Sequence, residues 1–264
     1  MGISPDGTHI VTVDKHNDHY LCIWNASNNA SPVYKEKSGG DPSMDVCFTK
    51  CEGQYNAWSV GTYGALAWDP VQMKKKRGQF GSHDRCGFAC CTADDQGNMY
   101  AGASNSLIYV FAGNVIKKAI GFSGKGFIGS INWVNGKLYA GSRSGTVSVV
   151  DSASMECIEN IDFGMLPRAI DEKDGNLIVG LRNGSIVQCN LESKEQTTYM
   201  QSHNDGEVWG LALDDAFVYT SGDDNQVKKW DPFSRTCVET SIVNEAVRKA
   251  KKNRASTLGK HPDS

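Results

Sequence analysis

A repeat of about 40 residues is the feature that most constrains the fold of this chain. Each repeat carries a short apolar strand, a turn, a second strand, and then a third strand that ends near one anchor residue. The six anchors follow one another at intervals of about 39 to 44 residues: Trp24, Trp68, Phe111, Val150, Cys189 and Trp230. That period is typical of the four-stranded blade of a β-propeller. Because one blade cannot bury both of its faces, we expect the blades to stack around an axis and share a core.

Tight turns that contain glycine separate the predicted strands. Hairpin sequences stand at 5–7 (PDG), 135–136 (NG) and 174–175 (DG), where glycine accepts a positive φ without a steric clash. We therefore predict an all-β propeller over residues 1–264 with about six four-stranded blades. The repeats are expected at roughly 1–34, 43–72, 86–117, 127–162, 168–200 and 203–243.

Charge and composition argue against several classes of partner. The formal net charge is −3, so the chain has no general attraction to nucleic acid or to an acidic membrane. No apolar run approaches the roughly 20 residues that span a bilayer, and the N-terminus lacks the parts of a secretory signal. The nine cysteines are an odd number without framework spacing, which predicts reduced thiols in the cytoplasm.

The sixth repeat holds four polar residues in an order known from WD-repeat propellers. In such blades a His before the first strand, a Ser or Thr in the second, an Asp in the next turn and a Trp in the third form one hydrogen-bonded chain. The corresponding residues here are His203, Thr220, Asp224 and Trp230. We predict a structural frame, because a connected set satisfies each buried polar member and no nucleophile motif accompanies a His-Asp pair.

The other repeats depart from this order. The turn Asp recurs as Asp18, but the remaining repeats hold Thr62, Asn105, Ser144 or Asn183 at that position. The anchor Trp is absent from the three middle repeats, so we expect those blades to depend on apolar packing.

Neither a metal site nor a cofactor site is predicted. The set His83, Cys86, Cys90 and Cys91 fits no common zinc spacing, and adjacent residues of a strand point to opposite faces. Buried thiols that pack as small apolar side chains are the better interpretation. The chain also lacks the glycine-rich phosphate-binding motifs, so we expect no cofactor and no small-molecule substrate.

Four stretches, in their order along the chain, resemble blades of the echinoderm microtubule-associated protein-like family. The most specific is HNDGEVWGLALDDAFVYTSGDDNQVKKWDP, in which a His, a Gly and a Glu precede Trp-Gly-Leu. The others begin at MGISPDG, GDPSMDV and KKKRGQFG. The resemblance implies a non-enzymatic protein of the microtubule cytoskeleton, in cytoplasm and often in cilia or flagella. Family members carry two joined propellers, so we expect this chain to be a fragment or a short gene product, incomplete at both ends.

Two basic clusters are the candidate partner-binding residues. One comprises Lys74, Lys75, Lys76 and Arg77, and the other comprises Arg248, Lys249, Lys251 and Lys252. On a chain that is slightly acidic overall, each is a local site for an acidic partner such as tubulin. The alternative is a solvated strand or loop without a partner. The predicted function is a microtubule-associated or axonemal structural protein, and the alternative is a general WD-repeat adaptor in signalling or protein turnover.

Overall fold

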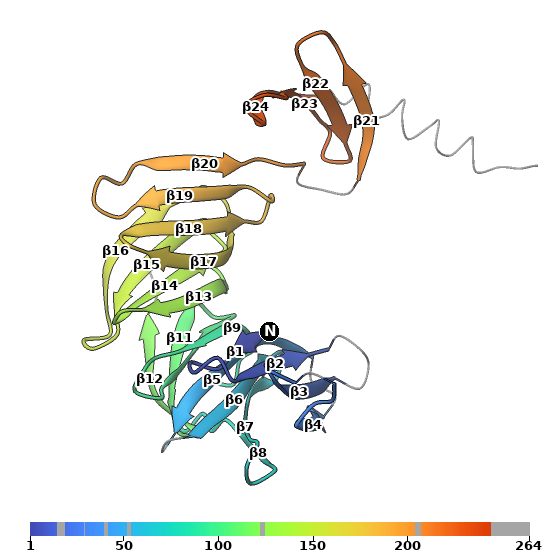
Figure 1. The fold of residues 1–264 in the computed structure, drawn as a ribbon. Coiled ribbons are helices and arrows are strands. Elements are labelled where there is room, and N and C mark those ends of the chain that lie inside the picture. The colour runs from blue at the N-terminus through green and yellow to red at the C-terminus, as the bar shows by residue number, and fades with distance from the viewer. Residues whose placement is uncertain are drawn as a thin grey trace, which may run out of the picture. The chain divides into compact units, whose positions relative to one another are not determined.

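The computed structural model describes residues 1–14, 19–28, 30–39, 42–51, 54–121, 125–203 and 207–243. Every regular element in these ranges is a β-strand, and the strands form six antiparallel sheets of four (Figure 1). This confirms the prediction of an all-β WD-repeat propeller built from four-stranded blades. Across the described ranges, no helix is long and apolar enough to cross a membrane.

The sheets follow one another along the chain, and the strands of each sheet pair in sequential order. The first two sheets are β1 (Gly2–Ile3), β2 (His9–Val13), β3 (Tyr20–Asn25) and β4 (Tyr34–Lys37), then β5 (Ser43–Cys51), β6 (Gln54–Gly61), β7 (Gly64–Asp69) and β8 (Lys74–Arg77). The next two are β9 (Phe88–Ala93), β10 (Met99–Ala103), β11 (Leu107–Ala112) and β12 (Val115–Gly121), then β13 (Ile128–Val134), β14 (Lys137–Ser142), β15 (Thr146–Asp151) and β16 (Glu156–Asp162). The last two are β17 (Pro167–Lys173), β18 (Asn176–Leu181), β19 (Ile186–Asn190) and β20 (Gln196–Met200), then β21 (Val208–Leu213), β22 (Val218–Gly222), β23 (Gln226–Asp231) and β24 (Thr236–Ile242).

The fourth strand of several sheets extends a few residues past the repeat boundary expected from the sequence. Strand β4 reaches Lys37, β8 reaches Arg77 and β12 reaches Gly121. These outer strands are rich in lysine, and all four residues of β8 are exposed. Such strands lack the alternation of apolar and polar residues by which a half-buried strand is recognised.

The predicted hairpins form tight turns. Asn135 and Gly136 have φ values of 48° and 80°, and Asp174 and Gly175 have values of 52° and 77°. Positive φ at both central residues is the geometry of a type I′ turn, whose twist matches that of the flanking strands. The sequence therefore fixes the register of β13 with β14 and of β17 with β18 locally.

The described chain divides into two compact units. One comprises Met1–Leu181 and Cys189–Glu195, and the other comprises Arg182–Gln188 and the chain from Gln196 onward. Within the first unit, the first strand of each sheet contacts the first strand of the next, from β1 through β5, β9 and β13 to β17. Each core cluster is correspondingly shared by neighbouring sheets, as when Val11 and Leu21 pack with Phe48 and Trp68. This is the shared core expected of stacked blades.

Polar groups on these first strands join one sheet to the next. The Asp45 carboxylate of β5 accepts a hydrogen bond from the Cys91 amide of β9 at 2.9 Å. The Ser130 hydroxyl of β13 donates to the Pro167 carbonyl of β17 at 3.0 Å. Burial raises the pKa of the Asp45 carboxyl group, and the amides that donate to it oppose that rise. Both bonds fix the position of one blade along its neighbour.

Candidate functional site

The four residues of the predicted frame lie together in the sixth sheet. Nδ1 of His203 is 2.9 Å from each carboxylate oxygen of Asp224, and Nε2 is 2.8 Å from the Thr220 hydroxyl. The indole of Trp230 donates to the same hydroxyl at 2.7 Å. Because Thr220 accepts from Trp230, its own proton is free to go to Nε2, and the Nδ1 proton then goes to Asp224.

This hydrogen-bonded chain is enclosed by the protein. The side chains of His203 and Asp224 are 6% and 0% exposed, so a substrate has no access to the pair. Asp224 also accepts from the Gln226 amide at the start of β23. We propose that the set stabilises the turn between β22 and β23 and takes no part in chemistry. Asp18, the other predicted turn Asp, lies outside the described residues.

The bond between an anchor Trp and a hydroxyl occurs in two more sheets. Trp24 donates to Thr12 at 2.9 Å, and Trp68 donates to Ser59 at 2.9 Å. In the sheets without an anchor Trp, the position of the hydroxyl is apolar and fully buried: Ala101, Ala140 and Val179. Sequence reasoning identified the hydroxyl in the sixth repeat alone. The hydroxyls of the other two sheets stand at an equivalent position, two residues after the residue that pairs with the anchor across the strands. A comparison of that position in all repeats would have found them.

The first basic cluster forms the outer strand of the second sheet. Strand β8 pairs with β7, and its residues stand opposite Leu66 to Asp69. Lys75 is already engaged: its amine is 2.8 Å from a Glu36 carboxylate oxygen, 2.6 Å from the Lys37 carbonyl and 5.3 Å from the Trp68 ring centroid. For Lys74, Lys76 and Arg77, no side-chain bond is found within the described ranges. The structure thus leaves three cations of the predicted four for a partner.

The neighbouring outer strands add to this positive edge. Strand β4 presents Lys35 and Lys37 near the Tyr20 ring, and β12 carries Lys117 and Lys118. By contrast, the outer strand of the fourth sheet, β16, contains three acidic residues and no basic one. We refer to the outer edge formed by β4, β8 and β12 as the basic edge. The second basic cluster, Arg248 to Lys252, lies outside the described residues.

The cysteines considered for a metal site are divided between two cores. Cys90 and Cys91 are adjacent on β9, and each packs into a different apolar cluster. Burial raises the pKa of both thiols. The Cys90 thiol also contacts the Ile128 carbonyl at 3.5 Å. Over the part of the chain that the structure describes, no group of three or more His, Cys, Asp or Glu residues is arranged to hold a metal ion.

Curated proteins with similar sequences include a ciliary WD-repeat protein and echinoderm microtubule-associated proteins. The ciliary WD repeat-containing protein ctxp80 of Euplotoides octocarinatus is 32% identical over 268 residues, covering 100% of this chain and 37% of that protein. The 77 kDa echinoderm microtubule-associated protein of Strongylocentrotus purpuratus is 27% identical, covering 85% of this chain and 34% of that protein. Human echinoderm microtubule-associated protein-like 2 is 24% identical, covering 94% of this chain and 39% of that protein. Over most of its length, this chain is similar to a ciliary WD-repeat protein and to echinoderm microtubule-associated proteins.

The resemblance stated from the sequence is thereby confirmed, and it extends over most of the chain. The chain spans between about 34% and 39% of the length of these relatives. No protein-family model matches the sequence. Among solved structures, the computationally designed Ika8 protein has a similar fold, with a TM-score of 0.59 at 14% identity, over 89% of this chain and 72% of that one.

Proposed function

We propose that this chain is a non-enzymatic, microtubule-associated structural protein of the cytoskeleton or axoneme. It binds tubulin or other cytoskeletal proteins through outer strands and loops that the blades hold rigid. The basic edge carries the proposal, because it concentrates cations on a chain whose net charge is −3. The names of the relatives, one ciliary and two microtubule-associated, support the same assignment. The proposed location is the cytoplasm and its cytoskeleton, including cilia or flagella.

The strength of such binding follows from ordinary surface electrostatics. An exposed ion pair contributes about 0.2–1 kcal/mol, and salt screens it beyond about 8–10 Å. Three free cations on β8 therefore give weak affinity by themselves. Useful binding needs the other lysines of the basic edge and repetition along the microtubule lattice.

Reversal of the free charges on β8 tests the proposal. The variant Lys74→Glu/Lys76→Glu/Arg77→Glu should co-sediment with microtubules more weakly than the wild type, while its thermal unfolding stays unchanged. Lys75 is left in place because it bonds to Glu36 and packs on Trp68, so its loss would also disturb the first two sheets.

A matched control keeps the same change in net charge but disperses it. Lys50, Lys125 and Arg182 are exposed and lie away from β8 in the sequence, so reversing them should affect co-sedimentation less. An equal loss of co-sedimentation in both variants would show that net charge alone causes the effect. Unchanged co-sedimentation of the β8 variant would remove the basic edge from the proposal. A tagged chain that is diffuse in cytosol, away from axoneme and spindle, would favour the general adaptor.

A further inference from the structure

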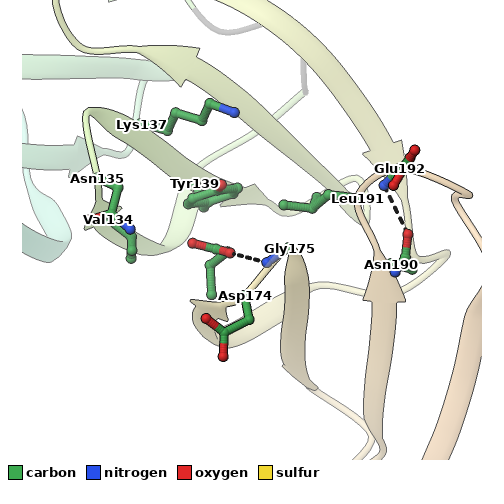
Figure 2. Close-up of a pocket in the computed structure, with 10 residues that line it drawn as sticks. Val134, Asn135, Lys137, Tyr139, Asp174, Gly175, Asn190, Leu191 and Glu192 are labelled. Atoms are coloured by element: carbon green, nitrogen blue, oxygen red, sulfur yellow. Dashed lines mark hydrogen bonds between the residues drawn. The ribbon is translucent and has the colours of Figure 1, made fainter.

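A polar groove lies between the fourth and fifth sheets, on turns that the microtubule proposal does not use. It holds about 480 Å³ and is lined by Val134, Asn135, Lys137, Tyr139, Glu172, Asp174, Gly175, Asn190, Leu191 and Glu192. Figure 2 shows the Tyr139 ring lying across the groove, with Lys137 on one side of it and Asp174 on the other.

Tyr139 belongs to a position that recurs in three sheets. Tyr100, Tyr139 and Tyr219 each directly follow the residue that pairs with the anchor of their sheet. In two sheets the Tyr hydroxyl donates to the Asp at the start of the preceding turn. Tyr100 donates to Asp94 at 2.9 Å, and Tyr219 donates to Asp214 at 2.8 Å.

Tyr139 lacks that acceptor. Val134 occupies the turn position that Asp94 holds in the third sheet. In both sheets, the residue just before the Tyr has a cross-strand partner, and Asp94 or Val134 directly follows that partner. No hydrogen bond to the Tyr139 hydroxyl is found among the residues that the structure describes, although the residue is 1% exposed and lines the groove. Polar groups of buried residues nearly always have a hydrogen-bond partner. Because this hydroxyl belongs to a residue that lines the groove, a ligand in the groove can supply that partner.

The charges around the hydroxyl are mainly negative. Glu172, Asp174 and Glu192 line the groove, and Lys137 is its one basic residue. Lys137 stands opposite the carboxylate residue Asp151 in the β14–β15 ladder. One Glu172 oxygen accepts from the Gly175 amide at 2.8 Å, which holds the carboxylate in place. Its second oxygen makes no hydrogen bond within the part of the chain that the structure describes.

The hydroxyl itself stays neutral under physiological conditions. Burial, followed by the charges of Glu172 and Glu159, raises the pKa of Tyr139 to about 12. A neutral phenol surrounded by carboxylates accepts hydrogen bonds from a cationic donor and does not itself add positive charge to attract an anion.

We propose that this groove binds a lysine or arginine side chain from a basic segment of a partner protein. The cationic group donates to the Tyr139 oxygen and to the Glu172 carboxylate, while Asp174 and Glu192 supply further negative charge. The inference does not depend on microtubule binding, because it concerns other residues and the opposite sign of charge.

The probe is the peptide acetyl-Gly-Arg-Gly-amide, titrated into the full chain and followed by amide NMR shifts. The Gly175 and Leu191 amides report on the groove, since Leu191 donates to the Gly175 carbonyl. Saturable shifts at both amides are expected. The same peptide with citrulline, which has the shape of arginine but no charge, should give no saturable shift.

Three variants assign the contacts. Tyr139→Phe should weaken binding by about fivefold, as expected for the loss of one hydrogen bond, and Glu172→Gln by at least as much. Val134→Asn should weaken binding too, because the neutral Asn side chain then accepts the hydrogen bond of the Tyr139 hydroxyl, in the way that the Asp94 carboxylate accepts that of Tyr100. Tyr100→Phe is the matched control and should leave the peptide affinity unchanged.

Unfolding measurements separate a ligand site from a structural role. Tyr139→Phe should leave the unfolding temperature unchanged because its hydroxyl has no partner, whereas Tyr100→Phe should lower it. Equal shifts with the citrulline peptide, or unchanged affinity in both Tyr139→Phe and Glu172→Gln, would overturn the proposal. In that case the groove holds only a solvated tyrosine.

Discussion

At the scale of single residues, two buried polar groups, the indole of the anchor Trp and a hydroxyl on the second strand, occur together or are both replaced by other residues. Wherever an anchor Trp occurs, the second strand supplies a hydroxyl: Thr12, Ser59 or Thr220. Where the anchor is Phe111, Val150 or Cys189, the corresponding position is Ala or Val. The reason is energetic, because a buried donor or acceptor that loses its partner costs more than a pair replaced by apolar groups.

The second sheet allows this rule to be tested. Trp68→Phe should lower the free energy of unfolding by at least about 1–3 kcal/mol, because it leaves the Ser59 hydroxyl buried without its donor. Adding Ser59→Ala should then restore part of the loss, since the resulting pair matches Phe111 and Ala101 of the third sheet. Urea unfolding of the wild type, both single variants and the double variant completes the cycle.

The sign of the coupling decides the outcome. Ser59→Ala alone should destabilise the protein, because it leaves the Trp68 indole N–H unpaired. A Ser59→Ala change that is equally harmful in the wild type and in the Trp68→Phe variant would contradict the rule.

At the scale of strands and sheets, close approach between blades explains small residues that look arbitrary in the sequence. A Cβ on Gly141 of β14 would lie 2.6 Å from both the Pro167 side chain and the Ser130 hydroxyl. Those two residues also form the hydrogen bond between β13 and β17. The glycine therefore admits the first strand of the next blade. At the corresponding place in β18, a Cβ on Gly180 would meet Ala169 at an ordinary 3.5 Å.

We expect the two glycines to respond differently to the same substitution. Gly141→Ala should reduce stability by about 1–3 kcal/mol, because overpacking forces Pro167 away from β14. Gly180→Ala should fall within about 0.5 kcal/mol of the wild type or stabilise it slightly, since alanine restricts the unfolded chain. Thermal and urea unfolding of both variants measure the contrast, and an equal effect at the two positions would show that blade contact is not the cause.

At the scale of the whole molecule, charge is distributed unevenly although the total is nearly balanced. The chain carries 27 basic and 30 acidic side chains, yet β8 alone holds four cations and β16 holds three acidic residues. Long-range attraction from the overall field is therefore absent, and any electrostatic binding must arise from local patches.

This distribution predicts a steep response of microtubule binding to salt. Raising the ionic strength from about 0.05 M to about 0.2 M should weaken co-sedimentation, because it shortens the distance over which exposed charges interact. The β8 triple variant should show a smaller salt dependence than the wild type, since fewer ion pairs remain to be screened. Binding that is insensitive to salt would instead indicate an apolar interface.

The sequence by itself determined the repeat, the all-β class, the tight hairpins and the resemblance to echinoderm microtubule-associated proteins. These follow from local chemistry: the spacing of anchors, the alternation along strands, and the Asn-Gly and Asp-Gly turns that fix neighbouring strands within a few residues. The order His203, Thr220, Asp224 and Trp230 also stands within one repeat, so its hydrogen bonds could be anticipated from the sequence.

Only the tertiary structure decided which polar groups are free. Lys75 meets Glu36 and Lys37 from the previous sheet, 38 residues from its carbonyl acceptor, so nothing local distinguishes it from Lys74 and Lys76. Tyr139 and the bonded Tyr100 each begin the same Tyr-Ala-Gly sequence, and the difference lies in whether Asp94 or Val134 stands at the turn. Whether a polar side chain finds a hydrogen-bond or ion-pair partner depends on strand register and on neighbouring blades, which the pattern of residues along the sequence does not specify.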